Sequence, residues 1–316
     1  MTDREIILDS LMEILEKGQY SHLVLRSVLQ KYDYLPKQQR SFIKRTCEGT
    51  IENKIYIDYV IDSFAKTKTP KMKPLIRTLL RMGTYQILFL DKIPVSAAVN
   101  EAVEQTKTYA NKRAAGLVNG SLRTLARRRD ELIQPHDLAT KYSHPQPLVD
   151  CLRASMDDET LEAFLAADND IPKTALQVNP LKAAPEQVAA ALDEAGVAYE
   201  PHPWLHGCFL VSGTGNLEAL PLFQSGAVYV QDPAAKLAVL VSGAAPGMRV
   251  LDCCAAPGGK SFAMAEKMQG KGSVTSCDIY EHKLKRIRDG AARLGLPNIR
   301  TELQDASVCR EEWKDS

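Results

Sequence analysis

The feature that most constrains this chain is a strand, a glycine-containing turn and a helix in direct succession. Met248–Cys253 (MRVLDC) is an apolar run of strand length, Cys254–Lys260 (CAAPGGK) supplies the turn, and Ser261–Met268 predicts a helix. Glycine lets the backbone approach a ligand closely, and a helix N-terminus favours negative charge. The arrangement is typical of the start of a nucleotide-binding α/β unit with a parallel sheet.

Three ligand classes use such a turn, and the residues discriminate between them. A Walker A loop requires a glycine five residues before Gly259, and Cys254 stands there instead, although Lys260 and Ser261 match the end of that motif. The dinucleotide fingerprint G-x-G-x-x-G is absent. The class that remains is the Rossmann-like class I fold that binds S-adenosyl-L-methionine.

The chain also supplies the acids that this fold uses for the ribose and the adenine. Asp278 follows a strand expected over Gly272–Cys277, and Asp305 follows a strand expected over Ile299–Leu303, with a helix over Glu281–Leu294 between them. The carboxyl ends of parallel strands meet at the crevice where ligands bind. Both acids could instead be helix N-caps. We favour cofactor contact because both follow strands with matching spacing.

Charge is distributed unevenly along the chain, which carries a net +1 in total. Residues 1–145 carry a net +8, residues 146–235 a net −10, and residues 236–316 a net +3. Such asymmetry indicates separate domains, and a basic first segment favours a polyanion such as nucleic acid. Three domains with differently solvated surfaces would produce the same pattern.

Apolar residues recur at helical spacing throughout residues 2–129, where we expect about seven short helices and no strand. This predicts an all-α bundle with its own core. Basic residues cluster before Pro74 and at helical spacing after it, and we expect them to contact RNA phosphates. These candidate RNA-binding residues are Lys66, Lys68, Lys71, Lys73, Arg77 and Arg81.

The middle of the chain is acidic and alternates predicted strands with predicted helices. A polar, proline-rich stretch (YSHPQP) precedes it and is typical of a linker. Alternating strands and helices predict a small α+β domain of ferredoxin-like type. The expected domains are therefore 1–130, helical; 131–147, linker; 148–235, small α/β connector; and 236–316, the N-terminal part of a methyltransferase domain.

Two stretches carry a family resemblance. The sequence LRMGTYQILFLDKIPVSAAVNEAVEQTKTY, followed by KRAAGLVNGSLR, resembles the NusB-type RNA-binding helical domain. The sequences LDCCAAPGGK and VYVQDPAAKLA resemble the first motif of the RNA cytosine-5 methyltransferases and the segment that precedes it. Together, in this order, they resemble the RsmB/Sun family of bacterial 16S rRNA cytosine-5 methyltransferases over essentially the whole chain.

The resemblance implies S-adenosylmethionine as cofactor and 16S rRNA as partner. It assigns Asp278 to the ribose and Asp305 to the adenine end of the cofactor. It assigns the turn to the methionine end, through Cys254, Ala255, Ala256, Pro257, Gly258, Gly259 and Lys260. The family chemistry uses a cysteine thiolate that attacks C6 of cytosine, so that C5 accepts the methyl group.

The catalytic cysteines of the family lie in Pro-Cys and Thr-Cys motifs that follow the fourth and fifth strands of the methyltransferase fold, and neither motif occurs in residues 236–316. Cys253 and Cys254 belong to the turn, and Cys309 stands in VCR, so we assign no catalytic residue in this chain. Too few residues follow Val250 for about seven strands, so we expect either a fragment of a longer enzyme or the product of a truncated gene. An RNA-binding module with an inert half domain is the alternative function. We further expect a cytoplasmic monomer without a metal site or a membrane span.

Overall fold

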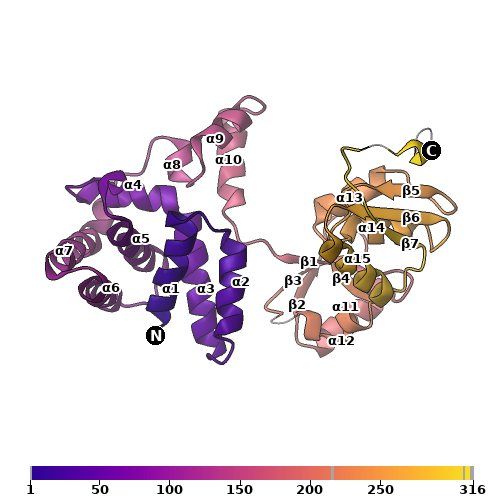
Figure 1. The fold of residues 1–316 in the computed structure, drawn as a ribbon, viewed down its shortest axis with the longest axis horizontal. Coiled ribbons are helices and arrows are strands. Elements are labelled where there is room, and N and C mark those ends of the chain that lie inside the picture. The colour runs from indigo at the N-terminus through magenta and orange to yellow at the C-terminus, as the bar shows by residue number, and fades with distance from the viewer. Residues whose placement is uncertain (1, 215–216, 309, 314–316) are drawn as a thin grey trace. The chain divides into compact units, whose positions relative to one another are not determined.

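A computed structural model of the chain describes residues 2–214, 217–308 and 310–313 (Figure 1). The chain forms two compact units, Met1–Asp170 and Ile171–Ser316. Residues 148–170, which the sequence analysis assigned to the connector, fall in the first unit in this division. Each unit is described by itself below.

The first unit is helical, as expected. Its helices are α1 (Asp3–Leu11), the π-helical turn η1 (Met12–Glu16), α2 (Ser21–Lys31), α3 (Lys37–Glu52), α4 (Lys54–Phe64), the 3-10 turn η2 (Thr69–Lys71), α5 (Pro74–Phe89), α6 (Val95–Tyr109), α7 (Lys112–Arg128), the 3-10 turn η3 (Arg129–Glu131), α8 (Leu138–Lys141), α9 (Gln146–Arg153) and α10 (Asp158–Asp168). Local sequence sets several helix starts. Thr2 caps α1 in a reciprocal capping box with Glu5, and Pro74 occupies the first turn of α5.

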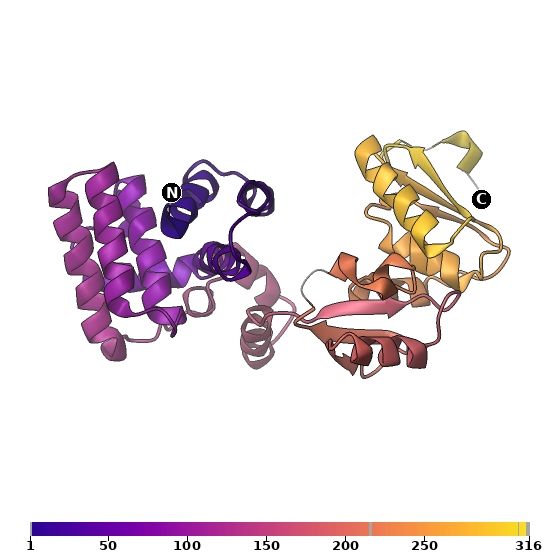
Figure 2. The ribbon, with the colours of Figure 1, turned by 90° about the horizontal axis from the view of Figure 1, so that it is seen from below.

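Helix α5 lies at the centre of this unit and contributes to two apolar cores. Leu80 packs with α4, α6 and α7, while Leu79 packs with α1 and α3. Figures 1 and 2 show α5, α6 and α7 side by side. A Cβ at Gly83 would lie 2.7 Å from a methyl group of Leu122, so a larger residue there would force the Leu122 side chain of α7 to shift.

The second unit begins with a four-stranded antiparallel sheet in the order β2-β3-β1-β4. Its elements are β1 (Thr174–Val178), α11 (Pro185–Glu194), β2 (Ala198–Pro201), β3 (Cys208–Ser212), the 3-10 turn η4 (Leu217–Ala219), α12 (Pro221–Gln224) and β4 (Val228–Val230). This order and connectivity are ferredoxin-like, so the predicted class of the small domain is confirmed. Val188 and Leu192 of α11 share one core with Leu176 and Val228 of the sheet.

A three-stranded parallel sheet follows, in the order β5-β6-β7. Its elements are α13 (Pro233–Val241), β5 (Arg249–Asp252), α14 (Gly259–Lys267), β6 (Ser273–Asp278), α15 (Glu281–Leu294), β7 (Ile299–Leu303) and the 3-10 turn η5 (Glu311–Trp313). Strands joined by helices in this order form the start of a Rossmann-like domain, as predicted. The bounds of α15 and β7 agree with the sequence prediction residue for residue.

No helix in the described ranges combines the length and apolar character needed to cross a bilayer.

Candidate functional site

The predicted cofactor turn joins β5 to α14 and is held against the sheet by its backbone. The N–H of Ala255 donates to the carbonyl of Cys277 on β6 at 2.9 Å, and the N–H of Gly258 donates to the carbonyl of Ala255 at 2.7 Å. Gly258 has φ of +114°, and a Cβ there would lie 2.4 Å from the Phe262 ring. Glycine is therefore required at residue 258 both by its backbone conformation and by its close approach to Phe262.

A buried chain of hydrogen bonds fixes the first turn of α14 to the ends of two strands. The Ser261 hydroxyl donates to Asp252 Oδ2 at 2.8 Å, and the Ser276 hydroxyl donates to Ser261 Oγ at 2.8 Å. All three side chains are buried. The first N–H groups of a helix lack intrahelical acceptors. This anchoring holds those donors of α14 in place beside the turn, where they can receive a carboxylate.

Asp278 ends β6 at the same edge of the sheet as the turn and is largely buried. Its Oδ1 accepts from the N–H of Tyr280 at 3.2 Å and lies 3.7 Å from the Lys283 ammonium. Among the described residues, Oδ2 has no protein hydrogen bond. Asp278 can therefore accept a hydrogen bond from a hydroxyl at the crevice.

Asp305 lies two residues beyond β7 and is exposed. Its Oδ1 accepts from the hydroxyl and the N–H of Ser307, at 2.7 and 2.8 Å. These hydrogen bonds lower the pKa of the Asp305 carboxyl, which stays ionised at neutral pH. The polar groups of the site fit S-adenosylmethionine. The free N–H groups at the start of α14 can donate to its carboxylate, and the carboxylates of Asp278 and Asp305 can accept from its ribose and adenine. Lys260 is exposed at the start of α14, where it can meet the carboxylate.

Four of the described cysteines are poorly suited to act as nucleophiles. Cys47, Cys208 and Cys277 are buried, and burial raises the pKa of the Cys277 thiol to about 11. Cys253 is exposed in the turn, yet desolvation raises the pKa of its thiol as well. A thiol with a raised pKa is largely protonated at neutral pH and is a poor nucleophile. Cys309, which the sequence analysis considered, lies outside the described residues.

Sequence reasoning missed a buried polar cluster between the ferredoxin-like sheet and α14. The carboxylate of Glu266 accepts from the Tyr229 hydroxyl at 3.0 Å and lies 3.4 Å from the Lys236 ammonium. Its second oxygen is buried without a partner among the described residues. Burial raises the pKa of Glu266 to about 7. The available signal was an acid within the otherwise apolar run SFAMAE.

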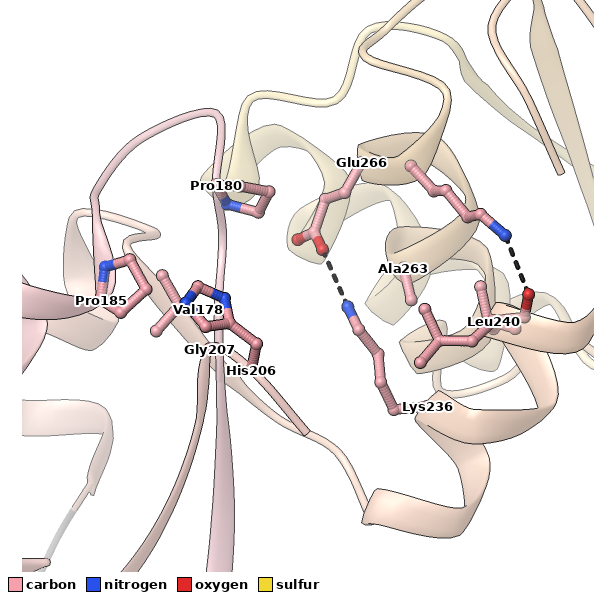
Figure 3. Close-up of a pocket in the computed structure, with 11 residues that line it drawn as sticks. Val178, Pro180, Pro185, His206, Gly207, Lys236, Leu240, Ala263 and Glu266 are labelled. Atoms are coloured by element: carbon pink, nitrogen blue, oxygen red, sulfur yellow. Dashed lines mark hydrogen bonds and ion pairs between the residues drawn. The ribbon is translucent and has the colours of Figure 1, made fainter. Parts of the chain in front are cut away.

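Glu266 and Lys236 form one wall of a cavity of about 260 Å³ within the second unit. Figure 3 shows Val178, Pro180 and Pro185 on the opposite wall. The cluster lies at the far end of α14 from the cofactor turn. It links β4 of the small domain, which carries Tyr229, to the helix that starts at the turn.

The predicted RNA-binding lysines lie on an exposed and well-anchored segment. Lys66, Lys68, Lys71 and Lys73 are all exposed on or beside η2. The carboxylate of Asp62 fixes this turn, because it accepts from the N–H of Thr69 at 2.6 Å and from the Thr69 hydroxyl at 3.2 Å. The segment therefore presents its cations on a rigid support.

Arg77 and Arg81 pair with carboxylates of the helical unit, and the burial of Arg81 corrects the sequence expectation for that residue; Arg77 also donates to the carbonyl of Thr69 in η2 at 3.3 Å. The Arg81 side chain is only 5% exposed and donates to both oxygens of Asp58 at 2.7 Å. Arg77 is paired with Glu16 of η1. Helical spacing placed both arginines on one face, and that face packs against α4 and η1.

Within the described ranges, no group of three or more His, Cys, Asp or Glu side chains is placed to hold a metal ion.

Comparison with protein families reproduces the order of the three parts. Residues 1–127 match the NusB family, residues 144–218 match the ferredoxin-like domain of the RsmF/B-like methyltransferases, and residues 240–315 match the 16S rRNA methyltransferase RsmB/F family. One solved structure, titled "Crystal Structure of PH0851", superposes on 97% of this chain and 70% of its own with a TM-score of 0.72. At 24% identity, that similarity supports the fold alone.

The fold and these matches together define a ribosomal RNA methyltransferase with an N-terminal NusB-like domain. The probable ribosomal RNA small subunit methyltransferase B of Bacillus subtilis is 36% identical over 99% of this chain and 70% of its own length. The ribosomal RNA small subunit methyltransferase B of Escherichia coli O1:K1 is 30% identical over 93% of this chain and 67% of its own length. The chain belongs to the ribosomal RNA small subunit methyltransferase B family, and it spans about two thirds of the length of these relatives.

Proposed function

We propose that this chain holds S-adenosylmethionine and 16S rRNA for methylation of cytosine at C5. The observation that carries the proposal is the convergence of the turn, Asp278 and Asp305 at the carboxyl ends of three parallel strands. Open α/β sheets bind their ligands at that edge. Family membership supports the methyl transfer, and the cofactor turn supports the methyl donor.

In this proposal each residue of the site has a separate role. The N–H groups at the start of α14 and Lys260 bind the carboxylate of the cofactor, and the turn from Cys254 to Gly259 packs under its methionine part. Asp278 accepts from the ribose hydroxyls, and Asp305 accepts at the adenine end. The cofactor supplies an electrophilic methyl group when it is bound.

The cofactor role is tested by isothermal titration calorimetry with S-adenosylmethionine. We expect Asp278→Ala to weaken binding by about 1–3 kcal/mol, because a charge-assisted hydrogen bond is lost. Asp289→Ala is the matched control, since it removes an exposed acid of α15 that pairs with Lys285. Equal affinities for wild type and Asp278→Ala, or tighter binding of ATP than of the methyl donor, would contradict the assignment of this site to S-adenosylmethionine.

Transfer to C5 requires a nucleophile that first attacks C6, because C5 of cytosine is otherwise unreactive. The family resemblance assigns this step to a cysteine of the Pro-Cys and Thr-Cys motifs after the fourth and fifth strands, and neither motif occurs in residues 236–316. We therefore expect residues 1–316 to show no transfer of tritiated methyl groups to unmodified 16S rRNA. Turnover that Cys254→Ala or Cys309→Ala abolishes would show that the nucleophile was misplaced.

The helical unit holds the RNA in this proposal, through phosphate contacts from the lysines around η2. Replacing Lys66, Lys68, Lys71 and Lys73 with glutamine should weaken RNA binding and flatten its dependence on salt, because fewer counterions are released. RNA binding without methyl transfer is the second candidate function, favoured by the absence of a suitable cysteine. The calorimetric test distinguishes the two functions: binding of S-adenosylmethionine supports a second unit that takes part in methyl transfer, and no binding supports RNA binding alone.

A further inference from the structure

A groove of about 560 Å³ lies beside the predicted RNA-binding lysines, between η2 and the junction of α6 with α7. Lys71 and Lys73 line one side, and Asn111 and Arg113 line the other. Apolar side chains of α5 and α7, together with Met72, form much of the remaining lining. The sequence analysis singled out only the lysines of this groove.

The cations of the groove are uncompensated. Lys71, Lys73 and Arg113 are exposed, and within the described ranges none of the three has an ion-pair partner. No carboxylate lines the groove. By contrast, Arg77 is paired with Glu16 nearby. Unpaired cations gathered in one hollow produce a positive potential that attracts an anionic ligand.

The groove also offers an exposed aromatic ring and an exposed leucine. Tyr109 is 48% exposed and Leu117 is 44% exposed. Tyr109 is held in place, because its hydroxyl donates to Glu5 Oε1 at 3.1 Å. Asn111 caps α7 by accepting from the N–H of Ala114 at 2.9 Å. The apolar side chains are therefore presented by anchored segments.

Cations around an apolar, partly aromatic surface match the two halves of an unpaired nucleotide. Phosphates pair with Lys and Arg, and a base that has left its stack packs on aromatic and aliphatic side chains. A fully paired duplex would offer only its phosphates, because its bases stay stacked. An acidic peptide would satisfy the cations without requiring the exposed ring.

We propose that this groove binds unpaired nucleotides of RNA, with phosphates on Lys71, Lys73 and Arg113 and a base against Tyr109 and Leu117. The inference rests on the proposed RNA-binding function and deepens it, because it names single-stranded RNA as the form that the helical unit prefers. It also adds residues of α6 and α7 to the lysines around η2.

The experiment measures binding of the full chain by fluorescence anisotropy over a range of salt concentrations. The probes are an RNA hairpin with an unpaired loop, a blunt duplex of the same stem and an oligoglutamate peptide. Arg113→Gln tests the phosphate contact, with Arg123→Gln on the same helix as its control. Leu117→Glu tests the base contact, with Gly120→Glu one turn away as its control. Far-UV circular dichroism checks that each variant retains its helices.

We expect the hairpin to bind more tightly than the duplex. Leu117→Glu should weaken hairpin binding about tenfold, within the range for loss of one stacked base. Arg113→Gln should lower the slope of log K against log salt by about 0.7, the value for one phosphate contact on a single strand. The two controls should behave as wild type.

Three outcomes would overturn the proposal. If hairpin and duplex bind equally and neither groove variant differs from its control, the groove is not the RNA site, although RNA binding by the unit stands. If oligoglutamate binds and both groove variants lose it, the occupant is an acidic protein segment. If wild type binds neither RNA, the proposed RNA-binding function fails together with this inference.

Discussion

Each of the two units shields a carboxylate from solvent, Asp58 partly and Glu266 almost completely, and the two surroundings differ in the cation that they supply. In the helical unit, Asp58 accepts from both Nε and Nη2 of Arg81 at 2.7 Å, and both of its oxygens are satisfied. In the second unit, Glu266 has the ammonium of Lys236 at 3.4 Å and the Tyr229 hydroxyl at 3.0 Å, both at the same oxygen. Its other oxygen has no partner among the described residues.

The difference follows from burial, since Glu266 is 2% exposed and Asp58 is 19% exposed, and from the shapes of the two cations. A guanidinium presents a planar fork that matches both oxygens of a carboxylate, whereas an ammonium is a compact point charge. Burial then penalises the charged form of Glu266 more than its partners compensate, and the pKa of Glu266 rises to about 7. An arginine pair therefore acts as a fixed structural contact here, while the lysine pair changes its charge near neutral pH.

The largest expected effect on stability comes from removing the Arg81 guanidinium. Arg81→Met removes two charge-assisted hydrogen bonds to Asp58, although Lys54 still pairs with Asp58 and Arg77 with Glu16. We therefore expect the free energy of unfolding of the helical unit to fall by about 3 kcal/mol. Urea denaturation followed by far-UV circular dichroism measures this change. Lys44→Met removes an exposed pair with Glu48 at 3.8 Å and should cost no more than about 0.5 kcal/mol. Equal losses of unfolding free energy in the two variants would contradict the structural role of the Arg81–Asp58 pair.

The next effect concerns the pH dependence that Glu266 gives to the second unit. Its pKa is higher in the folded protein than its ordinary value of 4.5, so the folded chain keeps a proton that the unfolded chain has lost. The stability gained from that proton is complete below pH 4.5 and is lost as the pH rises through 7. A shift of this size corresponds to about 3 kcal/mol at most.

Glu266→Gln should therefore flatten this part of the stability profile. Thermal unfolding of wild type and variant at pH 5 and at pH 7.5 gives the comparison, and the difference between the two proteins should change with pH. Glu302→Gln, at a half-exposed acid of β7 that pairs with Arg310, is the matched control. Parallel profiles for wild type and Glu266→Gln would show that the carboxyl titrates at its ordinary pKa.

The same comparison shows what the sequence could predict. Local periodicity predicted α15 and β7. The acids at consecutive strand ends were expected at one edge of the sheet, because a parallel sheet places the carboxyl ends of its strands at the same edge. Pairing across the fold leaves no local signal. Arg81 meets Asp58 from 23 residues away, and Glu266 meets Tyr229 from 37 residues away. Arg77 and Arg81 were assigned to RNA for this reason, and the groove beside α7 was missed, since its two sides come from separate segments.

The smallest loss of stability is expected for Lys236→Met. The free energy of protonating Glu266 sets its upper limit. Without the ammonium, Glu266 can take up a proton instead of remaining charged. With a pKa of about 7, that protonation costs about 1.4 kcal/mol at pH 8 and almost nothing at pH 5. The loss of stability in Lys236→Met should therefore stay within about 1.4 kcal/mol at pH 8 and nearly vanish at pH 5.

Lys267→Met is the matched control, because Lys267 lines the same cavity but donates to the carbonyl of Leu240 rather than to a carboxylate. A loss in Lys236→Met that is the same at both pH values would mean that Lys236 stabilises the unit through its packing and its contact with Tyr229, and that its charge does not act on Glu266.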